Sequence, residues 1–108
     1  MKSYTTHWSF DRLEASRVLG VLANPHRLLV LGLLIDEEWD VGRLAKKLKL
    51  SQSALSQHLR ILRDAHLVST RRDGQMVYYS STSPEILHIL ELLNDDFMPV
   101  EERKAVAG

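Results

Sequence analysis

The sequence predicts an α+β fold that is mainly α-helical with a two-stranded β-hairpin, in the order α-α-α-α-β-β-α. Apolar residues recur at helical spacing up to residue 65 and again after residue 84, and between these regions the period changes to two. With 108 residues the chain can enclose one modest core, so we expect residues 1–108 to form a single domain.

Composition restricts the classes of protein to which this chain can belong. It contains no cysteine, which excludes disulfides, thiolate metal sites and thiol redox switches. The first eight residues lack the apolar core of a signal peptide, and the longest apolar run, residues 28–35, is far shorter than the ~20 residues of a membrane span. We therefore expect a cytoplasmic protein without membrane association.

Four helices are expected before the hairpin, at residues 11–23, 26–35, 41–48 and 52–65. The second has a clear start signal, because Asn24 stands before Pro25 and proline is favoured at the first position of a helix. Asp40 and Ser51 are suitable N-cap residues for the third and fourth helices. The second helix is apolar almost all round, which predicts a central place in the core.

The hairpin is expected from residues 67–72 and 75–81, with Asp73-Gly74 as its turn. Ser83-Pro84 then starts a last helix that extends to residue 97 and has too many apolar residues for a surface helix on so small a core. We therefore expect a homodimer in which the first and last helices pack against a second copy through Phe10, Leu13, Ile86, Leu90, Leu93 and Phe97. Residues 99–108 are expected to form a flexible tail.

The net charge of zero conceals an uneven distribution. Residues 43–72 carry eight basic residues and one acidic residue, a charge of +7, whereas residues 1–42 carry −2 and residues 73–108 carry −5. One basic surface on a neutral protein suits a polyanionic partner. A set of ordinary solvated helix faces is the alternative, and charge alone does not decide between the two.

The fourth predicted helix has two chemically different faces. Leu55, Leu59 and Leu62 form a buried stripe at helical spacing. The opposite face carries amides and hydroxyls instead of the Lys and Glu of an ordinary solvated face, and such groups suit base edges in a DNA groove. The residues expected to contact bases are Gln52, Ser53, Ser56 and Gln57.

A helix of this kind, preceded by a short helix and followed by a hairpin, defines a winged helix-turn-helix, whose expected partner is double-stranded DNA. Basic and polar residues near the helix are expected to contact the DNA backbone, directly or through the wing. They are Lys46, Lys47, Lys49, Ser51, His58, Arg60, Arg71, Arg72 and Gln75. For His58 a packing role inside the protein is an equal alternative.

Over nearly its whole length the chain resembles the ArsR/SmtB family of bacterial winged-helix repressors. The resemblance depends on residues 22–28 (LANPHRL), 50–59 (LSQSALSQHL) and 74–79 (GQMVYY), with Leu62-Arg63 and Leu67-Val68. It implies a homodimer that packs through its first and last helices and represses a promoter, and we expect its operator to be palindromic. The family's cysteine motif is replaced here by residues 40–44 (DVGRL), so the effector remains unknown.

Other functions have weaker support in the sequence. His88 and Glu91 are weak candidates for a zinc site in a metal-responsive repressor, but two ligands make a poor site, and we expect no metal or cofactor. An enzyme would need an activated nucleophile or an acid–base pair, which the serines of the fourth helix lack. A protein-interaction module would be expected to expose aromatic or aliphatic side chains where this chain has Gln, Ser and Arg.

Overall fold

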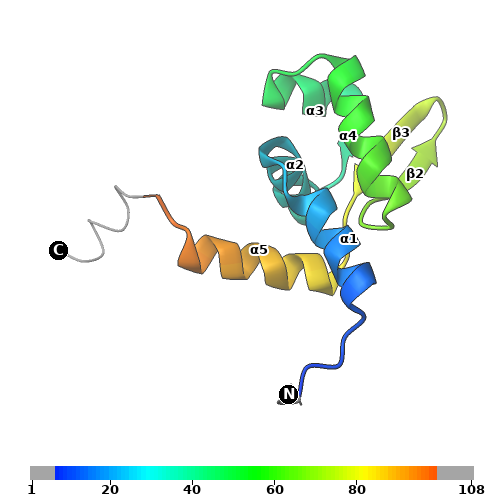
Figure 1. The fold of residues 1–108 in the computed structure, drawn as a ribbon. Helices are drawn as coiled ribbons and strands as arrows, with labels where there is room; N and C mark the ends of the chain where they lie inside the picture. The colour runs from blue at the N-terminus through cyan, green and yellow to red at the C-terminus, as the bar shows by residue number, and fades with distance from the viewer. Residues whose placement is uncertain (1–6, 100–108) are drawn as a thin grey trace.

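The computed structural model describes residues 7–99, which form five helices and three strands (Figure 1). They are α1 (Arg12–Leu22), α2 (Pro25–Asp36), β1 (Trp39–Asp40), α3 (Val41–Leu48), α4 (Gln52–Asp64), β2 (Ser69–Asp73), β3 (Met76–Ser80) and α5 (Pro84–Asp96). The helix bounds differ from the expected ones by one residue at most. The tail expected at residues 99–108 lies outside the described residues, apart from Pro99.

An N-cap side chain begins each described helix by accepting a hydrogen bond from a backbone N–H of the first turn. These caps are Asp11, Asn24, Asp40, Ser51 and Ser83. Proline at the first position of α2 and of α5 adds to the signal, because proline has no N–H that would need a partner there. The start signals at Asn24, Asp40, Ser51 and Ser83 are therefore confirmed.

The expected α+β fold and its β2–β3 hairpin are confirmed, but the described sheet has three antiparallel strands, in the order β1-β3-β2, where two were expected. Besides the hairpin of β2 and β3, Trp39 pairs with Tyr79 and Asp40 with Tyr78. A strand of two residues shows no alternation, so periodicity could not predict β1. Its pairing attaches the hairpin to the residues that directly precede α3.

The core lies around α2, which contacts α1, α4, α5 and β3. Val30, Leu31 and Leu34 of α2 are almost completely buried, which agrees with the expected central place of this helix. They pack in one cluster with Leu44 of α3 and Leu55, Leu59 and Leu62 of α4. Buried Ser81 closes the core, since its hydroxyl donates to the Leu67 carbonyl and its N–H donates to the Leu34 carbonyl.

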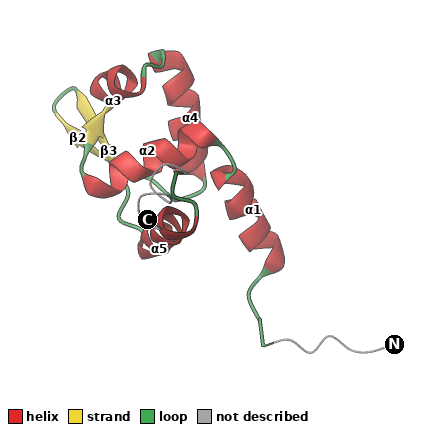
Figure 2. Ribbon diagram, turned by 90° about the vertical axis from the view of Figure 1, so that its left-hand side faces the viewer, coloured by secondary structure: helices red, strands yellow, loops and turns green. Residues whose placement is uncertain are grey.

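Two ends of the molecule have different chemistry. The hairpin and α3 lie at one end, and α5 lies at the other, beneath α2 (Figures 1 and 2). Large apolar side chains are exposed on α1 and α5, among them Leu13, Leu19, Leu87 and Leu92.

Within residues 7–99 no single helix has the length and apolar character to cross a membrane. The bent pair of α1 and α2, with 92° between the two helices, meets these criteria of length and composition only when both helices are counted together.

Candidate nucleic-acid interface

The two faces of α4 differ in burial as the sequence predicts. Leu55, Leu59 and Leu62 are no more than 1% exposed and fix the helix to the core. The opposite face is exposed and carries Gln52, Ser53, Ser56 and Gln57. The Ser51 hydroxyl accepts from the Ala54 N–H at 3.0 Å, so this exposed Ser51 is occupied in capping the helix. Because no charge dominates the exposed face, its amides and hydroxyls can bind a partner by directional hydrogen bonds.

A tight turn places three lysines beside the N-terminus of α4. Lys49 adopts the left-handed conformation, with φ of 57°, and its N–H donates to the Lys46 carbonyl at 3.2 Å. The next N–H, of Leu50, donates to the Ala45 carbonyl at 3.0 Å. These bonds satisfy carbonyls at the end of α3 and turn the chain into α4. Lys46, Lys47 and Lys49 are all exposed, so their cations border the helix that carries the amides.

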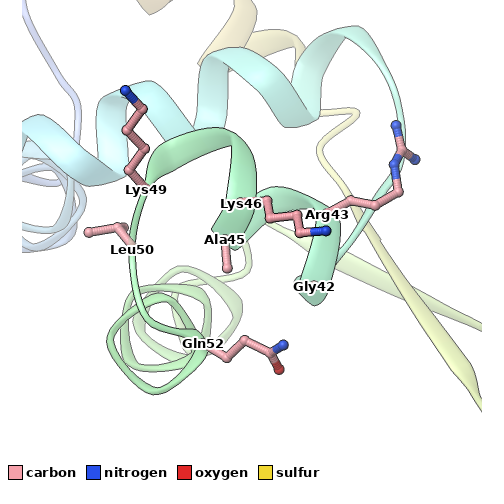
Figure 3. Close-up of a pocket in the computed structure, with 7 residues that line it drawn as sticks. All are labelled: Gly42, Arg43, Ala45, Lys46, Lys49, Leu50 and Gln52. Atoms are coloured by element: carbon pink, nitrogen blue, oxygen red, sulfur yellow. The ribbon is translucent and has the colours of Figure 1, made fainter.

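A shallow hollow connects α3 with the start of α4 (Figure 3). It is lined by Gly42, Arg43, Ala45, Lys46, Lys49, Leu50 and Gln52. Figure 3 shows that Lys46 and Gln52 extend toward the Gly42 end of the hollow, whereas Lys49 extends away from it. A Cβ on Gly42 would lie 3.8 Å from Gln52 Nε2, so the first turn of α3 is close to that amide. The hollow therefore places a group suited to phosphate, Lys46, beside a group suited to a base edge, Gln52.

The two adjacent arginines of the wing are both exposed, but in the described part of the chain only one of them has a carboxylate partner. Gly74, with φ of 63°, forms the turn, and the neighbouring Arg72 and Gln75 are exposed. Arg71 instead forms an ion pair with Glu38 and lies over the Tyr78 ring, with its Cζ 4.8 Å from the ring centroid. Within residues 7–99 Arg72 makes no ion pair, so the charge of Arg72 is not neutralised by a neighbouring carboxylate, unlike that of Arg71.

Two other residues expected at the DNA backbone lie differently along α4. Arg60 is exposed, and its guanidinium is 3.9 Å from the Asp64 carboxylate one turn later. His58 is half-buried against α2, where its Nδ1 accepts from Arg27 Nε at 3.4 Å and its ring centroid lies 5.6 Å from that of His26. This position favours the packing alternative for His58 over a contact with DNA.

The weak zinc candidates on α5 remain a pair of exposed residues. His88 and Glu91 are both exposed, and within the described part of the chain no three His, Asp or Glu side chains gather in a way that could hold a metal ion. Because a zinc site needs at least three protein ligands, these two residues do not form one by themselves.

Three charged residues near the interface were not identified from the sequence. Glu38 forms an ion pair with Arg71, and Arg27 donates to His58. The Arg43 Cζ lies 4.7 Å from the Trp39 ring centroid, and its Nη2 lies 3.7 Å from Glu37 Oε1. Two of these contacts join residues more than 30 positions apart, Arg27 with His58 and Glu38 with Arg71. Neither the period of the apolar residues nor the distribution of charge along the chain predicts contacts between residues so distant in sequence.

The exposed polar face of α4, its lysine border and the wing define a winged-helix DNA-binding protein. Comparison with known proteins agrees with this class. Residues 24–70 match the model of the "Bacterial regulatory protein, arsR family". The chain is 53% identical to the nodulation protein NolR of Rhizobium meliloti over 100 residues, which cover 89% of this chain and 82% of NolR. It is 48% identical to the transcriptional activator HlyU of Vibrio cholerae, over 75% of each chain.

Solved structures give the same result. The crystal structure of NolR from Sinorhizobium fredii has a TM-score of 0.75 at 48% identity and covers 82% of this chain and 94% of NolR. The repressor BigR from Xylella fastidiosa also has a TM-score of 0.75, at 30% identity, with 81% and 89% covered. The chain belongs to the ArsR family and is a DNA-binding transcriptional regulator, not an enzyme. Residues 67–73 (LVSTRRD) and 78–81 (YYSS) by themselves indicate a likeness to the rhizobial nodulation repressor, and the overall match to NolR confirms that likeness.

Proposed function

We propose that this protein is a sequence-specific repressor that binds a palindromic operator as a homodimer in the bacterial cytoplasm. The observation that carries the proposal is the exposed row of amides and hydroxyls on α4. Glutamine can bind adenine through two hydrogen bonds, and serine can contact several bases. We assign base contacts to Gln52, Ser53, Ser56 and Gln57, and backbone contacts to the lysines of the turn and to Arg72.

The apolar surface of α1 and α5 supports the homodimer. Leu13 is 85% exposed, Phe97 is 72% exposed and Phe10 is 60% exposed, while Leu90 and Leu93 are half-buried. Exposed apolar side chains gathered on two neighbouring helices favour a protein–protein contact. Ile86 does not belong to this surface, because it is 1% exposed and packs in the core of the protomer. We therefore propose the interface without Ile86.

A two-fold dimer defines the expected geometry of the operator. The two α4 helices would enter successive major grooves about 34 Å apart, and the operator would have matching half-sites. Among the relatives, HlyU is described as an activator and BigR as a repressor. We propose repression because a dimer that occupies a promoter excludes other proteins from it. The proposal includes no effector, since a repressor controlled by its own abundance needs none.

Selection of bound duplexes from a random DNA pool tests this proposal. The full chain is incubated with the pool at low and high salt, with and without Zn²⁺, and the Gln52→Ala variant is selected in parallel. We expect a palindrome that is enriched equally with and without zinc, and a relaxed preference at one base of each half-site in the variant. Enrichment that disappears on addition of zinc would instead support a metal-responsive repressor, and no enrichment at low salt would support an interaction module.

A further inference from the structure

Arg27 connects three elements of the fold. It lies in the first turn of α2, where its backbone N–H donates to the Asn24 cap at 3.1 Å. Its side chain donates twice, from Nη1 to the Val21 carbonyl in the last turn of α1 at 2.9 Å and from Nε to His58 Nδ1 on α4 at 3.4 Å. One guanidinium therefore joins α1, the helix of the proposed dimer contact, to the helix that carries the base contacts.

The chemistry of this contact suits arginine. The last carbonyls of a helix have no partner within the helix, and the Val21 carbonyl obtains one from Arg27. The planar guanidinium has donors that point in fixed, different directions, so it can reach a carbonyl and an imidazole at once. A lysine has a single nitrogen at the end of a flexible chain and would contact one of them at the expense of the other.

The contact requires a neutral imidazole, because Nδ1 can accept a hydrogen bond only when it carries no proton. The ionisable groups that act on His58 are Arg27 and His26, both from α2, and the residues one turn away on α4 are uncharged (Ala54, Leu55, Ile61 and Leu62). Burial, and then the charges of Arg27 and His26, lower the pKa of His58. Protonation would remove the acceptor and place a second cation beside the guanidinium.

We propose that Arg27 is a positioning residue for DNA binding, which holds the recognition helix α4 in place against the α1–α2 junction through the neutral imidazole of His58. The inference rests on the DNA-binding function of α4 and adds to it a residue that does not touch DNA. Loss of the contact lets α4 shift relative to α1. In a dimer held by α1, such a shift changes the separation of the two recognition helices.

The direction in which DNA affinity changes with pH distinguishes this role of His58 from a direct contact between His58 and DNA. A histidine at a phosphate becomes a better ligand when protonated, so acid would strengthen DNA binding. A histidine that accepts from Arg27 loses its function when protonated, so acid weakens DNA binding. For the DNA-free protein, the lowered pKa of His58 gives stability that is complete above the unfolded pKa and is lost as the pH falls through the folded pKa.

The experiment compares the full-length wild type with His58→Asn and His58→Phe. Asparagine has helix propensity similar to that of histidine and keeps an acceptor oxygen, but it does not titrate. Phenylalanine keeps a ring without an acceptor. Affinity is measured for a fluorescent duplex that carries the enriched sequence, from about pH 8 to about pH 5.5, across the ordinary histidine range. Unfolding by urea without DNA is measured over the same range.

We expect the wild type to lose at least about fivefold in affinity on acidification, H58N to change much less, and H58F to bind weakly at both ends of the range. Arg27→Lys should weaken DNA binding by the otherwise wild-type protein. It should have little further effect when combined with H58F, because each change removes the same Arg27–His58 contact. Wild-type binding that strengthens in acid, or equal pH profiles for wild type and H58N, would overturn the proposal. The urea measurement distinguishes failure of this proposal from failure of the operator proposal. If no sequence is enriched, the operator proposal fails. If the pH dependence of urea unfolding is then the same for wild type and H58N, the proposed Arg27–His58 contact also fails.

Discussion

Arg71 and Glu38 form a bidentate ion pair that joins strand β2 of the wing to the residue before β1. Arg71 Nε is 3.0 Å from Glu38 Oε2, and Nη2 is 3.0 Å from Oε1. These hydrogen bonds lower the pKa of the Glu38 carboxyl. The stabilisation from the pair is therefore complete above the ordinary pKa of glutamate and is lost as the pH falls through the lowered value. At neutral pH the pair is intact, and one wing cation is neutralised.

Neutralising Glu38 should make the wing more basic. In Glu38→Gln the charge of Arg71 has no carboxylate beside it, so we expect tighter binding to all DNA sequences and a salt dependence steeper by about one counterion. The measurement is the slope of log Kd against log salt for the operator and for a scrambled duplex. Glu91→Gln, far from α4, is the control for net charge. Weaker binding of the Glu38 variant at every salt concentration would show that the pair positions the wing.

Arg71 and Arg72 are a matched pair for testing the wing. Arg72→Ala should weaken binding to all sequences and reduce the salt slope by about one, because Arg72 is exposed and has no carboxylate partner within residues 7–99. Arg71→Ala should change the slope less, since Arg71 is already paired with Glu38. Fluorescence anisotropy at several salt concentrations measures both. An equal loss of slope in the two variants would contradict the assignment of the backbone contact to Arg72.

Gln52 should determine base preference and not general affinity. Gln52→Ala removes an exposed amide beside α3, so we expect a loss of about 1–3 kcal/mol for the operator and a relaxed preference at one base per half-site. Competition with operators changed at single positions measures the effect. Lys47→Ala is the control, because a backbone contact should weaken all sequences alike. An unchanged base preference would show that the assigned reading face is wrong.

The apolar surface of α1 provides a test of the dimer. Leu13→Glu places a charge on a side chain that is 85% exposed, so the protomer should fold normally while the dimer dissociates. Sedimentation equilibrium gives the mass, and circular dichroism confirms the fold. Ser69→Glu, at an exposed position of β2 in the wing and away from α1 and α5, is the control for the added charge and should stay dimeric. A dimeric Leu13→Glu variant would remove α1 from the proposed interface.

Ile86 should behave as a core residue although it lies on the helix of the proposed interface. Because Ile86 is 1% exposed, Ile86→Ala should lower the free energy of unfolding by about 2–5 kcal/mol. Met76→Ala, at the exposed wing, should change it by less than about 0.5 kcal/mol. Urea unfolding measures both. A small effect at Ile86 would place this side chain outside the core.

Short-range signals in the sequence were sufficient for the helices and for the faces of α4. Caps such as Asn24 and Ser51 act on the first turn that follows them, and the leucine stripe of α4 follows from helical periodicity. The prediction of Ile86 at the dimer surface is wrong because α5 is apolar on several sides, and periodicity cannot then show which side meets the core of the protomer.

Contacts distant in sequence could not be predicted. β1 has two residues, and its pairing with β3 depends on how α3 and the hairpin pack. The sequence leaves two roles open for His58, because its position shows that it lies on α4 but not which way the ring points. The guanidinium of Arg27, whose contact favours the packing role, comes from another helix.

Asp40 belongs to two elements at once, as the last residue of β1 and as the N-cap of α3. The pairing of β1 with β3 therefore attaches the hairpin to the residue that begins the helix-turn-helix, and we expect the wing and α4 to meet DNA already ordered. The conformational entropy of these segments is lost during folding and not during association. The free energy of the DNA contacts is consequently retained as affinity instead of being spent on ordering a flexible arm.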